Sequence, residues 1–327
     1  MFPQRYLVDP AVLNGIVYGC LYGIMCVGLT LTYMTTKVPN FAHSDFVVIA
    51  IFSSASAFIF GNLASPYLAL PVAFFVGGAV AVVVYLTVLK PLTKRGANIV
   101  VLMIATLAVD IVLTGFVAAL FFDYLGKTYA KLLADKGYYL FNLNQLPDFQ
   151  IFGQKGILIV APAALIVITI SLALLLNKTK FGVAMRAAIE NPNLARILGI
   201  NVERVYLVSW FIAGALAGIG GGLYAIQSPS PPATSSYIIV DIFSGVVLGG
   251  IGSIYGGIIG GLIVGFSETF VIRILTEFAD TYWGYAAGSE LATFQKGIPL
   301  AIMIITLLVI PKGLTSLNWR GLLKRFR

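Results

Sequence analysis

The chain has 327 residues, of which 59% are hydrophobic and only 10% are charged, and its mean hydropathy is +0.95. Because a soluble domain carries about 25% charged residues, this composition excludes an ordinary soluble fold. The net charge of +8 agrees with the excess of Lys and Arg in cytoplasmic loops of membrane proteins, so it does not indicate a nucleic-acid partner.

Apolar runs long enough to cross a bilayer recur along the chain, since a spanning helix needs roughly 20 apolar residues. The clear runs are residues 11–34, 67–88, 99–122, 157–176 and 207–227. Shorter, Gly-rich or interrupted runs are 41–60, 237–252, 254–274 and 291–310. Lipid leaves no hydrogen-bond partner for an open backbone, so these runs must be helices or a closed barrel. Runs this long and continuous are helices, because barrel strands alternate in polarity and are about half as long. We expect one all-α polytopic membrane domain over 1–327, with about eight to nine transmembrane or re-entrant helices.

The segment Pro39-Asn40-Phe41-Ala42-His43-Ser44-Asp45 opens the second run. Asn40 is expected to cap a helix, with His43 and Asp45 near its first turn. Two interpretations stay open: capping together with helix-dipole pairing, or a polar lining or inner gate of a transport path. His43 is the single histidine, so it cannot form a His-based metal site alone.

Ionisable residues inside apolar runs are candidates for function, because a charge in lipid is costly. Asp110 lies near the middle of its run and Asp241 lies inside the run 237–252. Asp110 should therefore face the bundle or a partner subunit. Together with Asn40, His43 and Asp45, these two residues are our candidates for a translocation path or gate, and a structural hydrogen-bonding role is the alternative.

Two polar stretches are expected to lie outside the cell. The first is the long loop 123–156, in which the stretch YYLFNL has a strand-like composition. The second is 275–290, whose aromatic residues suit a membrane interface.

The polar island 177–206 separates two strongly apolar runs. Residues 181–190 are expected to form one helix. Asn191-Pro192 has the pattern of a new helix start, and Gly199 is a natural terminator. This loop is either a contact for another protein or a helix pair lying on the membrane surface.

Glycine is dense in the stretch from Gly245 to Gly265. The spacing predicts close helix packing through Gly252, Gly256, Gly260 and Gly261, and a flexible gate is the alternative. The stretch is not a nucleotide-binding fingerprint, because Tyr255 stands where GxGxxG needs its last glycine.

With nine crossings, about two-thirds of the Lys and Arg residues fall on the side that holds the island and the C-terminal tail. The positive-inside rule then places both in the cytoplasm and the N-terminus outside. If the segment 41–60 is re-entrant, the number of crossings drops to eight and the N-terminus lies inside. Lys296 is assigned to the opposite, external side.

Transport in one direction needs a source of energy. The sequence has no GxxxxGK[ST] phosphate-binding loop, no HExxH motif, no metal cluster and no credible nucleophile–base pair. We therefore expect a protein that is not an enzyme, with no catalytic residues, no metal and no cofactor. Its energy comes from a partner or from a gradient.

Three stretches resemble the permeases of ABC importers for branched-chain amino acids. They are LNGIVYGCLYGIMCVGLTLTYM with VPNFAHSDF, then FGVAMRAAIENPNLARILGINVERV, and then VVLGGIGSIYGGIIGGLIVG. Their order is that of the family, and it favours the first of the two permease types that pair in these importers. One departure is Ser44, where the family commonly has Gly after the His.

The resemblance implies that the island is a coupling loop that docks on a separate ATP-binding subunit. The matching positions are Gly182, Arg186, Ala187, Asn191, Ala195, Gly199 and Ile200. It further implies a second permease subunit, an external substrate-binding protein, membrane lipid and a small-molecule cargo, in the plasma (cytoplasmic) membrane. The alternative is a self-sufficient channel or gradient-driven carrier for a small polar solute such as urea or an amide.

Overall fold

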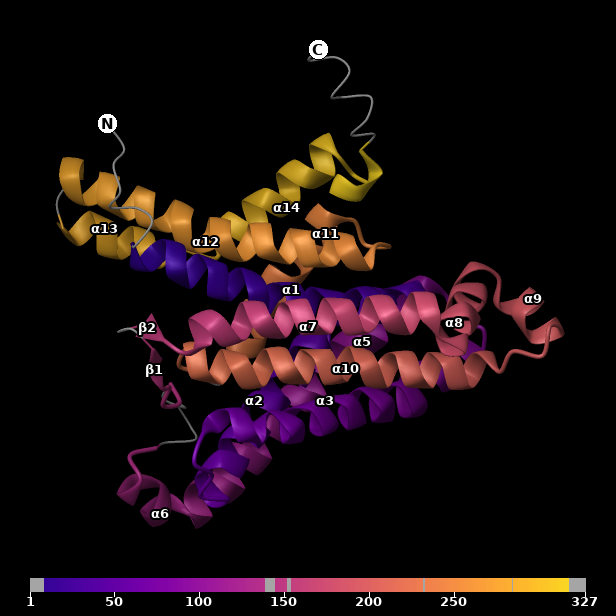
Figure 1. Ribbon diagram of the computed structural model, residues 1–327, viewed down its shortest axis with the longest axis horizontal. Coiled ribbons are helices and arrows are strands. Elements are labelled where there is room, and N and C mark those ends of the chain that lie inside the picture. Colours follow the sequence, from indigo (N-terminus) through magenta and orange to yellow (C-terminus); the bar gives the residue numbers. More distant parts are fainter. Residues whose placement is uncertain (1–8, 139–144, 152–153, 232, 284, 318–327) are drawn as a thin grey trace.

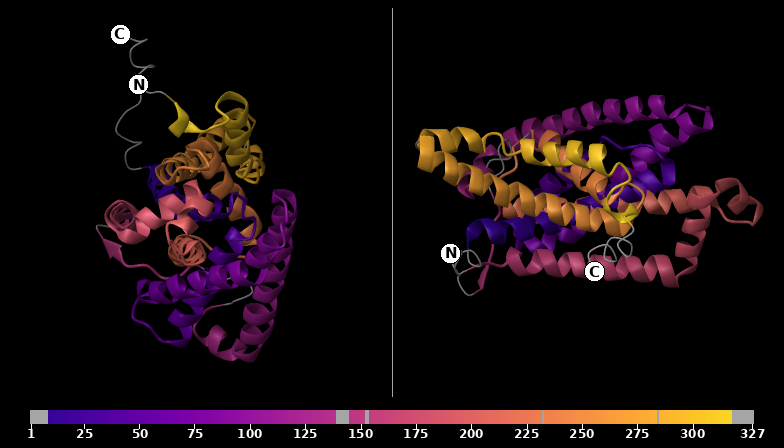
Figure 2. Two further views of the ribbon diagram at one scale, coloured as in Figure 1. Left: turned by 90° about the vertical axis from the view of Figure 1, so that its right-hand side faces the viewer. Right: turned by 90° about the horizontal axis from the view of Figure 1, so that it is seen from above.

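A computed structural model describes residues 9–138, 145–151, 154–231, 233–283 and 285–317 as a bundle of helices (Figure 1). Most helices run roughly along the long axis of the bundle (Figures 1 and 2). We call the end that carries α8 and α9 the loop end. The opposite end, with α6, a short β-hairpin and α13, is the far end.

The first half of the chain contains α1 (Pro10–Thr36), α2 (His43–Phe60), η2 (Pro66–Ala69), α3 (Leu70–Val84), η3 (Tyr85–Leu89), α4 (Lys90–Lys94), α5 (Ile99–Val117), η4 (Ala118–Gly126) and α6 (Ala130–Asp135). The hairpin of β1 (Gln150–Ile151) and β2 (Gln154–Lys155) is antiparallel, with Gln150 opposite Lys155.

The second half contains α7 (Ile157–Lys178), α8 (Lys180–Glu190), α9 (Pro192–Ile197), α10 (Val202–Gln227), α11 (Thr234–Gly249), α12 (Ile254–Trp283), α13 (Tyr285–Ala292), α14 (Gly297–Val309) and η6 (Leu314–Ser316).

The prediction of an all-α polytopic membrane protein is confirmed. Eight helical stretches in the described part of the chain are long and apolar enough to cross a membrane. The helix α11, with 16 residues, is a further, shorter apolar helix. The predicted span 237–252 is therefore displaced, because α11 begins at Thr234 and already ends at Gly249.

Glycines allow the central helices to pack backbone against backbone. Gly261 of α12 faces Gly23 of α1 so closely that a Cβ on Gly261 would lie 2.5 Å from the Gly23 nitrogen. Gly265 meets Gly19 in the same way, one turn further along. In the other half of the bundle, Gly214 of α10 lies against Gly77 of α3. Small residues at this spacing let helices approach closely where lipid supplies no hydrophobic driving force.

The glycine positions predicted for packing differ in their surroundings. Gly256 and Gly260 lie against the backbone of α11, at Gly249 and Gly245, and Gly261 lies against α1. The prediction that Gly252 mediates close helix packing is wrong. Gly252 precedes the first residue of α12, and nothing comes within 4 Å of a Cβ built on it.

The two polar stretches expected outside the cell are partly helical. Residues 118–126 continue α5 as a π-type helix, so the loop begins after Gly126 and not at residue 123. The stretch 275–290 is also corrected, because α12 continues to Trp283 and α13 follows from Tyr285. The YYLFNL stretch lies almost wholly outside the described residues.

Two helices begin inside the bundle and not at its ends. The first residue of α2, His43, lies beside Met25, near the middle of α1. Lys296, just before α14, reaches Tyr22 on α1 and Glu268 near the middle of α12. The last pass is therefore broken between α13 and α14. Irregular backbone at this depth is found in membrane proteins where it is buried in protein or lines a cavity.

Candidate functional site

The polar island forms a pair of short helices that project at the loop end (Figures 1 and 2). Thr179 caps α8 by accepting a hydrogen bond from the Gly182 nitrogen at 3.1 Å. Asn191 caps α9 by accepting one from the Leu194 nitrogen at 3.0 Å, and Pro192 occupies the first helical position. Gly199 ends the pair with a φ of +81°, which L side chains rarely adopt. The local sequence thus accounts for both helices and for the bend between them.

Several of the residues matched to the family's coupling loop hold this helix pair onto the chain itself. A Cβ at Gly182 would lie 2.5 Å from the Leu175 carbonyl oxygen, so α8 approaches the end of α7 closely. Arg186 donates to the Leu176 carbonyl at 2.7 Å and to Asn177 Oδ1 at 3.1 Å. These contacts fix the angle between α7 and α8.

The remaining matched residues divide between the inside and the outside of the loop. Ala195 is buried, and its carbonyl accepts from the Ile200 nitrogen at 2.9 Å. Ala187 and Ile200 are half-buried, whereas Asn191 and Gly199 are exposed. The conformation of the loop therefore rests on buried small residues, and its outer surface is formed by other side chains.

That outer surface is apolar around α9. Leu194, Ile197 and Leu198 are 51%, 81% and 69% exposed, and we call these three residues the apolar tip. The sequence analysis did not single out any of these three side chains as a site residue. Ile197 could have been identified from the sequence, because a large apolar residue in a polar loop outside the membrane spans cannot enter the core of the bundle.

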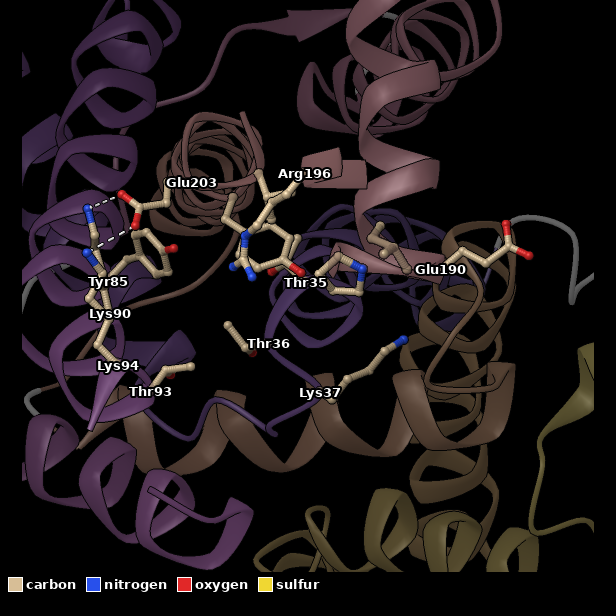
Figure 3. A pocket seen from close by; sticks show the side chains of 14 residues that line it. Thr35, Thr36, Lys37, Tyr85, Lys90, Thr93, Lys94, Glu190, Arg196 and Glu203 are labelled. Carbon is tan, nitrogen blue, oxygen red and sulfur yellow. Dashed lines mark ion pairs between the residues drawn. The ribbon is translucent and has the colours of Figure 1, made fainter. Parts of the chain in front are cut away.

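A cavity of about 620 Å³ lies behind the helix pair, between the ends of α1, α4 and α10 (Figure 3). Glu203 forms ion pairs across it with Lys90 at 2.7 Å and Lys94 at 3.1 Å. Lys37 and Arg196 also line the cavity, and Glu190 points away from it (Figure 3). Positive charge thus exceeds negative charge around this space, which favours anionic groups near the loop end.

The segment 39–45 lies deep in the bundle. Thr106 of α5 holds its backbone, because the hydroxyl oxygen accepts from the Phe41 nitrogen at 3.4 Å and the hydroxyl lies 3.4 Å from the Pro39 carbonyl. His43 Nε2 lies 3.1 Å from the Met25 carbonyl oxygen. The expected cap is corrected here: Ala42 is the N-cap, without a side-chain hydrogen bond. Asn40 instead accepts from the His43 nitrogen through its backbone carbonyl.

Asp45 and Asp110 come together although they are far apart in sequence. Thr114 donates to Asp45 Oδ1 at 3.1 Å, and Thr114 lies one helical turn after Asp110 on α5, so the two carboxyl groups are neighbours. Asp45 is buried, whereas Asp110 is half-buried. Figure 2 shows α5 along one flank of the bundle, and α5 buries only Leu102, Thr106 and Val117.

Asp241 belongs to a different cluster. Lys296 forms ion pairs with Asp241 at 2.5 Å and with Glu268 at 2.7 Å, and both carboxylates are almost wholly buried. Gln295 also donates to Glu268, at 3.1 Å. Asp241 therefore has an ion-pair partner of its own and, among the described residues, forms no ion pair with the segment 39–45. It also corrects the external assignment of Lys296, because the broken last pass brings this residue back into the bundle.

The chain was compared with known proteins. A family model described as the permease component of the branched-chain amino acid transport system matches residues 11–307. The chain belongs to this family. The resemblance noted in the sequence is thereby confirmed, and this permease is a multi-pass membrane transport component and not an enzyme.

Two relatives match the permease over nearly its whole length. The probable branched-chain amino acid transport permease protein LivH of Methanocaldococcus jannaschii is 42% identical over 321 residues, 97% of this chain and 95% of that protein. The high-affinity permease protein BraD of Pseudomonas aeruginosa is 26% identical over 320 residues, 95% and 97% of the two chains.

A third relative matches only in part. The ribose import permease protein RbsC of Bacillus subtilis is 38% identical over 127 residues, 36% of this chain and 39% of that protein.

Proposed function

We propose that this permease is a membrane subunit of an ATP-driven importer for branched-chain amino acids or related small polar solutes. A separate ATP-binding subunit docks on the α8–α9 loop and supplies the energy. The full-length relatives that carry branched-chain amino acid transport in their names support this cargo class. The partial match to a ribose permease supports a scaffold that is shared across cargo classes.

The observation that carries the docking proposal is the apolar tip. Leu194, Ile197 and Leu198 together place three large apolar side chains outside the helical bundle, on a loop whose conformation is fixed from within. Interfaces commonly bury such anchors in a pocket of the partner. The basic cavity behind the loop, lined by Lys37 and Arg196 among others, favours acidic groups on the docked subunit.

Orientation follows from the same proposal. The loop end is the cytoplasmic side, so α1 begins outside and the chain after η6 lies inside, in agreement with the positive-inside rule. A second permease subunit completes the path, and an external substrate-binding protein delivers cargo at the far end.

Ile197→Glu tests the docking contact without disturbing the permease core, because Ile197 is 81% exposed. We expect co-purification of the ATP-binding subunit to weaken by about 30-fold or more, since a buried interface anchor is worth about 2 kcal/mol or more. ATP-dependent uptake in proteoliposomes should fall in parallel.

The control is Leu132→Glu on α6 at the far end, where Leu132 is 42% exposed. This variant should retain the ATP-binding subunit and its uptake. Normal association and uptake in Ile197→Glu would contradict docking through the apolar tip. Uptake by the permease alone in liposomes, without ATP and without partners, would instead support a gradient-driven carrier.

A further inference from the structure

Buried polar atoms without a hydrogen-bond partner in the protein are concentrated in one short segment. Five of the ten such side-chain atoms in the described part of the chain belong to residues 40–45. They are both amide atoms of Asn40, His43 Nδ1, Ser44 Oγ and Asp45 Oδ2. Such an atom costs about 1–3 kcal/mol when it stays unpaired. A concentration of them at one place indicates a site that pairs with something polar.

These unpaired side chains at the start of α2, together with the α5 residues beside Asp45, form what we call the mid-bundle site. It consists of Asn40, Ser44, Asp45, Asp110 and Thr114. We propose that the mid-bundle site binds a zwitterionic α-amino acid. This inference rests on the proposed function and names the groups of the cargo that the permease recognises.

The ammonium group of the cargo fits the carboxyl pair. Asp45 and Asp110 adjoin each other inside an apolar bundle, and in the described residues no Lys or Arg forms an ion pair with either. His43, the single histidine, is directed to the Met25 carbonyl on α1. Two adjacent carboxylates at this depth are costly without a positive partner. An ammonium group has three donors and can serve both.

The carboxylate group of the cargo fits the amino end of α2. This helix has 18 residues, and its N-cap Ala42 makes no side-chain hydrogen bond. The positive end of the helix dipole favours an anion at such an end. Asn40 and Ser44, whose side chains are buried and unpaired, lie at this end and supply further donors.

The carboxyl pair and the amino end of α2 lie next to each other, as the ammonium and carboxylate groups of an α-amino acid do. Asp45 is in the first turn of α2, so the carboxyl pair and the helix end share one place in the fold. Phe41, stacked on Phe243 of α11 with ring centroids 5.0 Å apart, adds an apolar surface beside the segment. Transporters commonly bind substrates at the ends of helices that begin inside the membrane.

Equilibrium binding of radiolabelled leucine tests the site. The permease is assembled with its partner permease and ATP-binding subunits in nanodiscs, without a binding protein. Competition uses 3-methylbutylamine, which lacks the carboxylate, and 4-methylpentanoate, which lacks the ammonium group. Leucine should outcompete each by about tenfold or more, because one charged hydrogen bond is worth about 1.5–3 kcal/mol.

Asp110→Asn should weaken the binding of leucine by about tenfold or more, because the ammonium group of leucine loses a carboxylate partner. The affinity for 4-methylpentanoate, which has no ammonium group, should stay unchanged. Asn40→Ala should weaken the binding of leucine and of 4-methylpentanoate, which both carry a carboxylate. The affinity for 3-methylbutylamine, which lacks one, should stay unchanged. Asp123→Asn is the matched control, because Asp123 lies on η4, which continues the helix that carries Asp110, but it is exposed and pairs with Lys127. It should bind leucine as the unchanged permease does.

The inference is overturned if leucine does not bind to the unchanged assembly, or if Asp110→Asn and Asn40→Ala both keep the affinity of Asp123→Asn. If Asp110→Asn does not assemble, Asn40→Ala, which changes no charge, decides alone. Failure of the proposed function gives a different result: the unchanged assembly then shows no ATP-dependent uptake, whatever it binds.

Discussion

Replacing Lys296 with methionine is expected to destabilise the permease by about 3–5 kcal/mol, the cost of leaving buried charges without their partner. Lys296 is the ion-pair partner of both Asp241 and Glu268, which are 0% and 1% exposed. Thermal unfolding of the detergent-solubilised protein measures the effect. A loss of this size should lower the midpoint by roughly 10 °C or more.

Two further variants show whether the loss of the Lys296 charge causes the loss of stability. Lys127→Met removes the pair with Asp123, whose side chains are 78% and 65% exposed, and should cost less than about 1 kcal/mol. Adding Asp241→Asn to Lys296→Met removes one of the two uncompensated carboxylates, so it should restore part of the stability. A Lys296→Met permease as stable as the unchanged protein would mean that the cluster contributes nothing to the fold.

The second large effect is expected from Gly261→Val. A Cβ at this position meets the Gly23 backbone nitrogen at 2.5 Å, and the neighbour is a helix backbone that cannot turn away as a side chain can. The central pair α1 and α12 must then separate, at a cost of about 3 kcal/mol or more, the upper end of overpacking effects.

Gly115→Val is the matched control, because Gly115 is also in a membrane helix and nothing lies within 4 Å of a Cβ built there. It should express and unfold like the unchanged protein. Fluorescence-detected size-exclusion chromatography after heating compares the two variants directly. Equal thermal stability of the two variants would refute the close packing of α1 and α12.

The loop was predictable from the sequence because its signals are local. Asn191 and Pro192 start a helix and Gly199 ends one by short-range geometry, and the structure places all three in these roles. The long apolar runs were predictable for the same reason, because a bilayer imposes their length.

The two breaks inside the bundle were not predictable in this way. The count of Lys and Arg on the two sides assigns Lys296 to the external side, because the sequence alone does not show that Asp241 and Glu268 compensate its charge in the fold. Asn40 has the composition of a cap, but Thr106 of a distant helix fixes the backbone around it and moves the helix start to His43. Contacts between residues about 65 or 55 positions apart decide both cases.

The attachment of α5 has a consequence for the energy of the transport cycle. Hydrogen bonds between Thr106 and the segment 39–41, and from Thr114 to Asp45, join this helix to the bundle, and few of its apolar side chains are buried. A typical hydrogen bond contributes about 1 kcal/mol, whereas separating α1 from α12 would break a continuous glycine seam. Displacement of α5 is therefore expected to cost less free energy than separation of α1 from α12.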